Sequence, residues 1–269
     1  MKASQVLRRS LLTLGLLSVA VTAFAQAATE TFKPTVGQAG KDVVWVPTPQ
    51  ALVDKMLDMA KVTPQDYVMD LGSGDGRTVI TAAKRGATAQ GIEYNPDMVA
   101  LSERNAKEAG VTGKASFAKA DLFQTDLSKA TVITMFLLPD INLRLRPKIL
   151  DLKPGTRIVS NTFTMDDWEP DQRETVGGDC TSWCTALFWL VPAKVQGNWK
   201  MPNGTLTLTQ KYQMVTGSLN NMPITEGRLA GDQIRFSVGG TQYTGRVNGN
   251  TIEGTSSGAA SGSWRATKG

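Results

Sequence analysis

The fold is decided by Asp70-Leu71-Gly72-Ser73-Gly74-Asp75-Gly76-Arg77, a glycine-rich stretch between two segments of different hydrophobic period. The apolar run from Tyr67 is typical of a buried strand, and an amphipathic helix is expected to begin at Arg77. Glycines let the backbone turn tightly and let a ligand approach without meeting a Cβ atom. Because ligands of open α/β sheets bind at the carboxyl ends of strands, this bend predicts a binding site.

Strand and helix patterns alternate on both sides of the bend, which predicts a mostly parallel sheet with both faces covered. An apolar strand at residues 186–191 follows a connection too short for a crossover helix, so we expect an antiparallel edge hairpin. The predicted fold is α/β: a Rossmann-like, doubly wound sheet of seven strands. The other expected strands cover residues 67–70, 89–93, 115–118, 131–136 and 156–162, and the expected helices cover residues 50–60, 77–85, 96–109 and 141–152.

The composition changes after Pro192, where Gly, Thr, Ser and Asn dominate. Short runs of alternating apolar and polar residues are separated by turn signals such as Asn248-Gly249. We therefore predict a small antiparallel all-β domain at residues 196–269, as a barrel or a sandwich. Residues 45–195 are predicted to form the α/β domain, and residues 26–44 a linker.

The first 25 residues have the pattern of a secretion signal, with basic residues at Lys2, Arg8 and Arg9, an apolar run and small residues around Ala25. The apolar run is shorter than the roughly 20 residues of a membrane span, which favours cleavage over a retained anchor. We expect an exported, periplasmic or extracellular protein with no stable membrane anchor. The formal net charge is +5, and the signal carries three positive charges, which leaves +2. No basic stripe indicates nucleic-acid binding.

The sequence has two cysteines, Cys180 and Cys184, and no histidine. An oxidising compartment permits a disulfide between them, and two free buried thiols fit the C-x3-C pair equally well. With no further cysteine or histidine as a ligand, no zinc site is expected.

The glycine-rich bend differs from a dinucleotide site, which needs the spacing G-x-G-x-x-G and a helix N-terminus free for pyrophosphate. Asp75 places a carboxylate in the loop, which favours a phosphate-free, cationic ligand such as S-adenosylmethionine (SAM). Glu93, at the end of the second strand, can accept from the ribose hydroxyls, and Asp121, after the third, from the adenine amino group. The alternative is that these acids are ordinary helix caps and surface residues.

Over residues 45–192 the sequence resembles the class I, seven-strand SAM-dependent methyltransferases. It is most similar to the branch containing the lysine methyltransferases of ATP synthase c-subunit and adenine nucleotide translocase, on Val46-Pro47-Thr48, Asp70–Arg77, Leu138-Pro139 and Leu152–Gly155. The resemblance implies a methyltransferase acting on a protein side chain, with lysine favoured. The cofactor-binding residues it implies are Thr48, Asp70, Gly72, Ser73, Gly74, Asp75, Glu93, Tyr94, Asp121 and Leu122. The export signal and the β domain depart from these relatives and leave the acceptor open.

Members of this family place acceptor-facing groups at the end of the fourth strand. Asp140 is therefore the candidate catalytic residue, together with the carbonyl of Leu138. Asp140 is equally consistent with the N-cap of a helix that begins at Ile141. Methyl transfer depends mainly on positioning and desolvation, so it needs no histidine. Two alternatives are a SAM-binding protein without turnover and an envelope protein that binds through its β domain.

Overall fold

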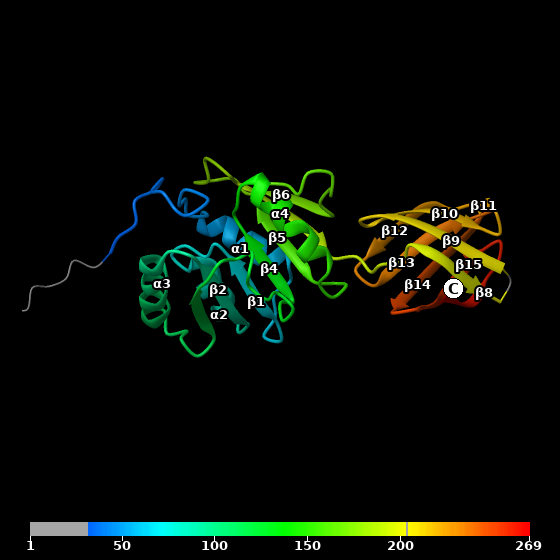
Figure 1. The fold of residues 1–269 in the computed structure, drawn as a ribbon, viewed down its shortest axis with the longest axis horizontal. Helices are drawn as coiled ribbons and strands as arrows, with labels where there is room; N and C mark the ends of the chain where they lie inside the picture. The colour runs from blue at the N-terminus through cyan, green and yellow to red at the C-terminus, as the bar shows by residue number, and fades with distance from the viewer. Residues whose placement is uncertain (1–31, 203) are drawn as a thin grey trace, which may run out of the picture. The chain divides into compact units, whose positions relative to one another are not determined.

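The computed structural model describes residues 32–202 and 204–269, and the predicted export signal lies outside them. The α/β domain is a seven-stranded sheet with helices packed against it (Figure 1). The helices are α1 (Gln50–Met59), α2 (Arg77–Lys84), α3 (Pro96–Glu108) and α4 (Pro139–Leu150). The strands are β1 (Tyr67–Leu71), β2 (Thr88–Glu93), β3 (Ala115–Lys119), β4 (Val132–Met135), β5 (Arg157–Asn161), β6 (Gln172–Thr175) and β7 (Thr185–Leu190).

The strand order is β3-β2-β1-β4-β5-β7-β6, which confirms the predicted doubly wound sheet. Strands β1 to β5 pair in parallel, whereas β7 is antiparallel to both β5 and β6. The edge hairpin is thus confirmed, with β7 inside the sheet and β6 at its edge. The order of the strands reverses between β1 and β4, and such a switch point is where open α/β sheets bind ligands.

Both faces of the sheet are buried under helices. Neighbouring residues of the central strands point to opposite faces, so they belong to two different apolar clusters. Val68 and Val132 pack with α1 and α2 in one apolar cluster, and Met69 and Ile133 pack with α4 in another. Burying one such side chain contributes about 1.5–3 kcal/mol. The helices end within two residues of the predicted positions, but α4 begins at Pro139 and not at Ile141. Within the described ranges, no helix combines the length and apolar character that crossing a membrane requires.

The second part is the predicted all-β domain, and it is a barrel. Strand β9 pairs with β8 on one side and with β10 on the other, which closes a circuit of eight antiparallel strands. Trp199 and Phe236 are buried in its core. The strands are β8 (Gly197–Met201), β9 (Gly204–Lys211), β10 (Met214–Leu219), β12 (Thr225–Ala230), β13 (Gln233–Val238), β14 (Thr241–Asn248), β15 (Thr251–Gly258) and β16 (Gly262–Lys268), with a short β11 (Met222–Pro223) beside β10.

The barrel is joined to the α/β domain by polar contacts around Asp171. Arg228 donates to this carboxylate over 2.6 Å, and the amide of Gln213 donates to the carbonyl oxygen of Glu169 over 2.8 Å. The ring of Tyr212 stacks on Trp168 with centroids 5.8 Å apart. These contacts connect the turn between β9 and β10, and strand β12, to the segment that leads into β6.

Candidate active site

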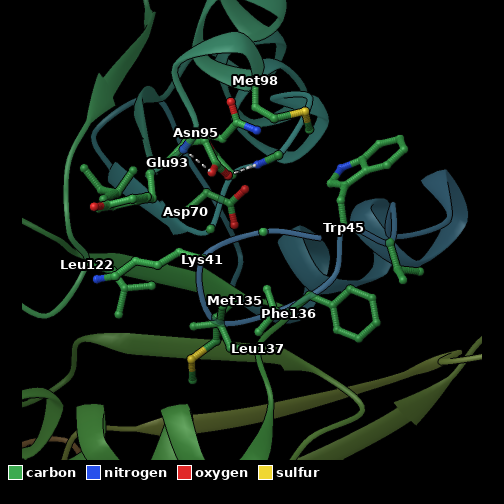
Figure 2. Close-up of a pocket in the computed structure, with 18 of the residues that line it drawn as sticks. Lys41, Trp45, Asp70, Glu93, Asn95, Met98, Leu122, Met135, Phe136 and Leu137 are labelled. Atoms are coloured by element: carbon green, nitrogen blue, oxygen red, sulfur yellow. Dashed lines mark hydrogen bonds between the residues drawn. The ribbon is translucent and has the colours of Figure 1, made fainter. Parts of the chain in front are cut away.

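A cavity opens at the carboxyl ends of β1, β2 and β4, at the switch point of the sheet. Figure 2 shows Asp70 and Glu93 on one side of it and Phe136 and Leu137 on the other. All ten residues predicted to bind the cofactor line this one cavity. The structure thus brings together side chains from the loop before α1, the glycine-rich bend and three strand ends.

The glycine-rich bend forms one wall, and its conformation requires glycine. Gly72, Gly74 and Gly76 have φ angles of +76°, +54° and +82°, which side-chain-bearing residues rarely adopt. The backbone N–H groups of Gly72 and Ser73 both donate to the carbonyl oxygen of Ile92, which fixes the bend against β2. The hydroxyl oxygen of Ser73 is buried without a hydrogen-bond partner in the structure.

Asp70 is a buried acid at the end of β1, with 6% of its surface exposed. Its Oδ1 accepts a hydrogen bond of 2.7 Å from the hydroxyl of Thr134 on β4. Burial raises the pKa of Asp70 to about 7, the Thr134 hydrogen bond opposes this shift, and the charges of Asp75 and Glu93 add to it. A cation placed in the cavity would favour the ionised carboxylate.

Glu93 ends β2 and holds the bend through both carboxylate oxygens. Oε2 accepts from the N–H of Gly74 over 3.0 Å, and Oε1 accepts from the N–H of Asn95 over 2.9 Å. A carboxylate has about four lone-pair sites, so each oxygen keeps acceptor capacity beyond its backbone donor. The side chain therefore sets the shape of the bend and retains acceptors for a diol.

Asp75 lies at the cavity wall, but its charge is paired within the protein. Arg77 contacts both carboxylate oxygens, with Nη2 2.5 Å from Oδ2 and Nε 3.0 Å from Oδ1. Nη1 of the same guanidinium donates to the carbonyl oxygen of Thr48 over 2.9 Å. Arg77, held in place by Asp75, thus fastens the start of α2 to the segment that contains Thr48. The Thr48 hydroxyl accepts from the Asn161 amide at 3.3 Å.

Asp121 follows β3, beside Leu122, and accepts from two donors. Its Oδ1 accepts from the N–H of Phe123, and its Oδ2 lies 2.7 Å from the ammonium of Lys41. The Lys41 hydrogen bond is the main cause that lowers the pKa of Asp121, and the same bond raises the pKa of Lys41. The ammonium also lies over the ring of Tyr94, 4.6 Å from its centroid.

The sequence-based interpretation missed the role of the segment before α1, which it treated as a linker. Residues 37–45 form a short turn-back, here called the entrance hairpin, with a bridge between Ala39 and Val44. Residues 38–44 all line the cavity. A Cβ atom at Gly74 would lie 2.7 Å from the indole nitrogen of Trp45, so this ring contacts the bend directly. The only sequence signal was Trp45 standing directly before the Val46-Pro47-Thr48 motif.

The candidate catalytic residue is placed differently from the cofactor group. Asp140 is exposed in the first turn of α4, and it is not among the residues that line the cavity. The N-cap position belongs to Leu138, so the alternative in which Asp140 caps the helix is wrong. The Leu138 carbonyl accepts from the N–H groups of Ile141 and Asn142, which occupies it within the helix start. A catalytic role for Asp140 stays a prediction.

The cavity fits a cationic, phosphate-free nucleoside. Its acidic side chains come from three neighbouring strand ends, and the unpartnered hydroxyl of Ser73 lies in its lining. The charge of Asp75 is neutralised by Arg77, whereas Asp70 and Glu93 have no cationic partner within salt-bridge distance among the described residues. Met135, Leu137 and Met98 supply apolar surface beside these acids. This donor and acceptor set suits an adenosine with a sulfonium group and would repel a diphosphate.

Comparison with known proteins agrees with this fit. The family model of the ANTKMT methyltransferase domain matches residues 70–172. A protein-lysine N-methyltransferase of Saccharolobus islandicus (strain REY15A) is 47% identical over 133 residues, which cover 48% of this chain and 83% of that protein. This chain belongs to that methyltransferase family. It is a SAM-dependent methyltransferase, and SAM is its cofactor.

Two further relatives show how far the likeness extends. The lysine N-methyltransferase of the ATP synthase c-subunit from Homo sapiens is 34% identical over 140 residues, 52% of this chain and 59% of that protein. The crystal structure of an RNA methyltransferase from Salinibacter ruber, in complex with S-adenosyl-L-homocysteine, is 46% identical with a TM-score of 0.52. It covers 56% of this chain and 96% of its own. Each of these matches leaves more than two fifths of this chain uncovered.

Proposed function

We propose that this methyltransferase is exported and transfers methyl groups to lysine side chains of proteins. The observation that carries the proposal is the complete cofactor cavity, in which every predicted binding residue meets at the switch point of the sheet. The relatives named above as lysine N-methyltransferases support lysine as the acceptor. Because the Salinibacter ruber relative is named an RNA methyltransferase, RNA is the alternative acceptor that should be tested alongside lysine.

Bound SAM would supply an electrophilic methyl group on its sulfonium: an N–C bond to the acceptor amine would form as the C–S bond breaks, with S-adenosylhomocysteine as the leaving group. The residues of the chain hold and orient the reactants. Glu93 and Asp121 provide acceptors for the nucleoside, and Asp70 provides a negative charge within the cavity wall. Trp45 and Leu137 line the same cavity with apolar surface. Electrostatic interactions are stronger where apolar surface excludes water.

A lysine acceptor must lose a proton before it can act as a nucleophile. At pH 7 this costs about 5 kcal/mol, given the reference lysine pKa near 10.4. The chain contains no histidine to accept this proton, so a carboxylate or water must take it. An amine that moves from a solvated position into an apolar cavity has a lowered pKa, which reduces this cost at the point of methyl transfer.

Export is supported by the pattern of the first 25 residues and by the disulfide that Cys180 and Cys184 form in the structure. Expression of the full chain in a bacterial host, with fractionation and intact-mass analysis, tests it. We expect a soluble periplasmic product whose mass corresponds to cleavage after Ala25. A full-length product confined to the cytosol would contradict export and would leave methyl transfer untouched.

The acceptor is tested by incubating the purified protein with radiolabelled SAM and either an envelope protein extract or total RNA. We expect label in protein, on lysine after hydrolysis, and no label in RNA. The Glu93→Ala variant, which removes the carboxylate at the bend, serves as the inactive control. Binding of S-adenosylhomocysteine without label in either acceptor would instead support a SAM-binding protein without turnover.

A further inference from the structure

A second recess adjoins the cofactor cavity, and its walls are aromatic. It is lined by Phe136, Phe163 and Trp183, with Leu138 and residues of the entrance hairpin completing it. Phe136 also lines the cofactor cavity, so the two spaces share a wall. The ring of Phe136 lies 5.9 Å from that of Phe163 and 6.0 Å from that of Trp183, measured between centroids. We call this space the aromatic recess.

The aromatic recess exposes apolar surface that a folded domain normally buries. Among the residues that the structure describes, seven large apolar side chains are exposed, and three of them line this recess: Val44, Leu138 and Trp183. Trp183 keeps 44% of its surface accessible. Contiguous exposed apolar surface next to a reaction site indicates a binding surface.

The lining of the aromatic recess also includes two charged residues. Asp42 and Lys41, both from the entrance hairpin, line it. The Asp42 carboxylate lies 3.8 Å from the ammonium of Lys41, which is itself bound more closely, at 2.7 Å, to Asp121. Aromatic faces and a carboxylate together are the surroundings that proteins use for alkylated ammonium groups.

Trp183 is held at the recess by a small covalent ring. The disulfide between Cys180 and Cys184 closes a loop of five residues, and Trp183 lies within it with a φ of +53°. That backbone conformation is rare for a bulky residue, so the surrounding structure must impose it. The loop base is fixed where the N–H of Val176 donates to the Cys184 carbonyl, and the N–H of Thr162 donates to that of Thr185. The latter bond places the loop beside Phe163.

We propose that the aromatic recess receives the ammonium end of the acceptor lysine, with Trp183 as a binding wall positioned by the Cys180–Cys184 disulfide. The proposal rests on the proposed lysine function. The alkyl stem of the lysine lies against Leu138 and Val44, and the ammonium faces the three aromatic rings and Asp42. The shared wall at Phe136 connects this position to the cofactor cavity.

The test is a titration of the full chain, saturated with S-adenosylhomocysteine, with Nα-acetyl-Nε-trimethyllysine methylamide. The readout is the indole N–H signal of Trp183 in the NMR spectrum of 15N-tryptophan-labelled protein, assigned by its loss in Trp183→Phe. The matched probe is the neutral analogue in which carbon replaces the charged nitrogen. We expect the Trp183 signal to shift and the charged probe to bind at least threefold more tightly, since a cation over aromatic faces gains roughly two- to thirtyfold in affinity.

Two kinds of variant distinguish the contribution of the Trp183 ring from that of the disulfide that positions it. Trp183→Phe should keep affinity for the charged probe within about threefold, and Trp183→Ala should lose about tenfold, each with unchanged affinity for S-adenosylhomocysteine. The double variant Cys180→Ser, Cys184→Ser should weaken the charged probe by several-fold. If Trp183→Ala does not fold, the comparison of the two probes on the unchanged chain still decides.

Two results overturn the inference: equal affinity for the charged and neutral probes, or no shift of the Trp183 signal at saturation. Failure of the proposed function gives a different result: the protein labels no lysine in the extract assay. A protein that labels lysine but leaves the Trp183 signal unshifted refutes the aromatic recess alone.

Discussion

The ammonium of Lys41 and the carboxylate of Asp121 form an ion pair of 2.7 Å between the entrance hairpin and the end of β3. Lys41 thereby occupies the carboxylate of Asp121, which the sequence analysis assigns to the adenine amino group of the cofactor. Lys41→Met should therefore tighten S-adenosylhomocysteine binding by about two- to fivefold, because the ion pair no longer has to open before the carboxylate accepts from the adenine. Isothermal titration calorimetry measures the change.

Lys107→Met, on the exposed side of α3, is the control for the lost charge and should leave the affinity unchanged. Weaker binding by Lys41→Met would mean that the ammonium contacts the cofactor itself and does not compete with it.

Glu93→Gln tests the acid at the end of β2. The amide keeps the size of the side chain but replaces one acceptor oxygen with a donor, which then faces the N–H of Gly74 or Asn95. We expect S-adenosylhomocysteine affinity to fall about 10- to 100-fold, which is roughly 1.4–2.8 kcal/mol. Glu103→Gln on α3 should bind normally. Normal binding by Glu93→Gln would remove this residue from the cofactor site.

Asp70 should make stability depend on pH in the absence of cofactor. Its pKa is raised to about 7 in the folded state, against about 3.9 when unfolded, so the folded state holds the proton more tightly. The resulting stabilisation is fully present below about pH 4 and is lost as the pH rises to about 7. Relative to Asp70→Asn, the wild-type free energy of unfolding should fall by up to about 4 kcal/mol across this range.

Urea denaturation of both proteins at pH 4, 5.5, 7 and 8 measures this difference. Asp179→Asn, at an exposed position, should show no comparable trend. A constant difference between wild type and Asp70→Asn across the range would show that the carboxyl group is ionised in the folded state.

The contact between barrel and α/β domain predicts a loss of stability in Arg228→Met. The Asp171 side chain is only 12% exposed, so removal of Arg228 leaves a largely buried carboxylate with neutral donors only. We expect about 1–3 kcal/mol of destabilisation in urea. Arg246→Met breaks the exposed, 3.5 Å pair with Asp232 and should cost under about 1 kcal/mol. Equal effects would argue that the Arg228 contact contributes nothing special.

The bend at Asp70–Arg77 and the strands around it could be predicted because periodicity and glycine spacing are local properties of the sequence. The same signals predicted that Glu93 and Asp121 lie at one edge of the sheet, and both line the cavity there; their contact with the cofactor stays a prediction. The edge hairpin was predictable from the short connection before β7. The acids, their order and the sheet topology are thus encoded in short stretches.

Tertiary contacts account for what could not be predicted. The entrance hairpin has no helical or strand period, so nothing in the sequence signalled that Lys41 reaches Asp121. Local pattern could not choose between a disulfide and free thiols, because the pairing depends on how the chain before β7 brings Cys184 to Cys180. Asp140 was placed near the acceptor by its position after β4, but the earlier start of α4 leaves it exposed in the first helical turn.

The closure of the barrel has a consequence for the behaviour of the protein in concentrated solution. Because β9 is paired with β8 on one side and with β10 on the other, it is not a free edge to which another molecule can add a strand. The other sheet has two edge strands, β3 and β6. All four residues of β6 are exposed, and the strand carries the charges of Arg173 and Glu174. Charged edges resist intermolecular strand pairing, so β6 is protected against the addition of a strand from another molecule.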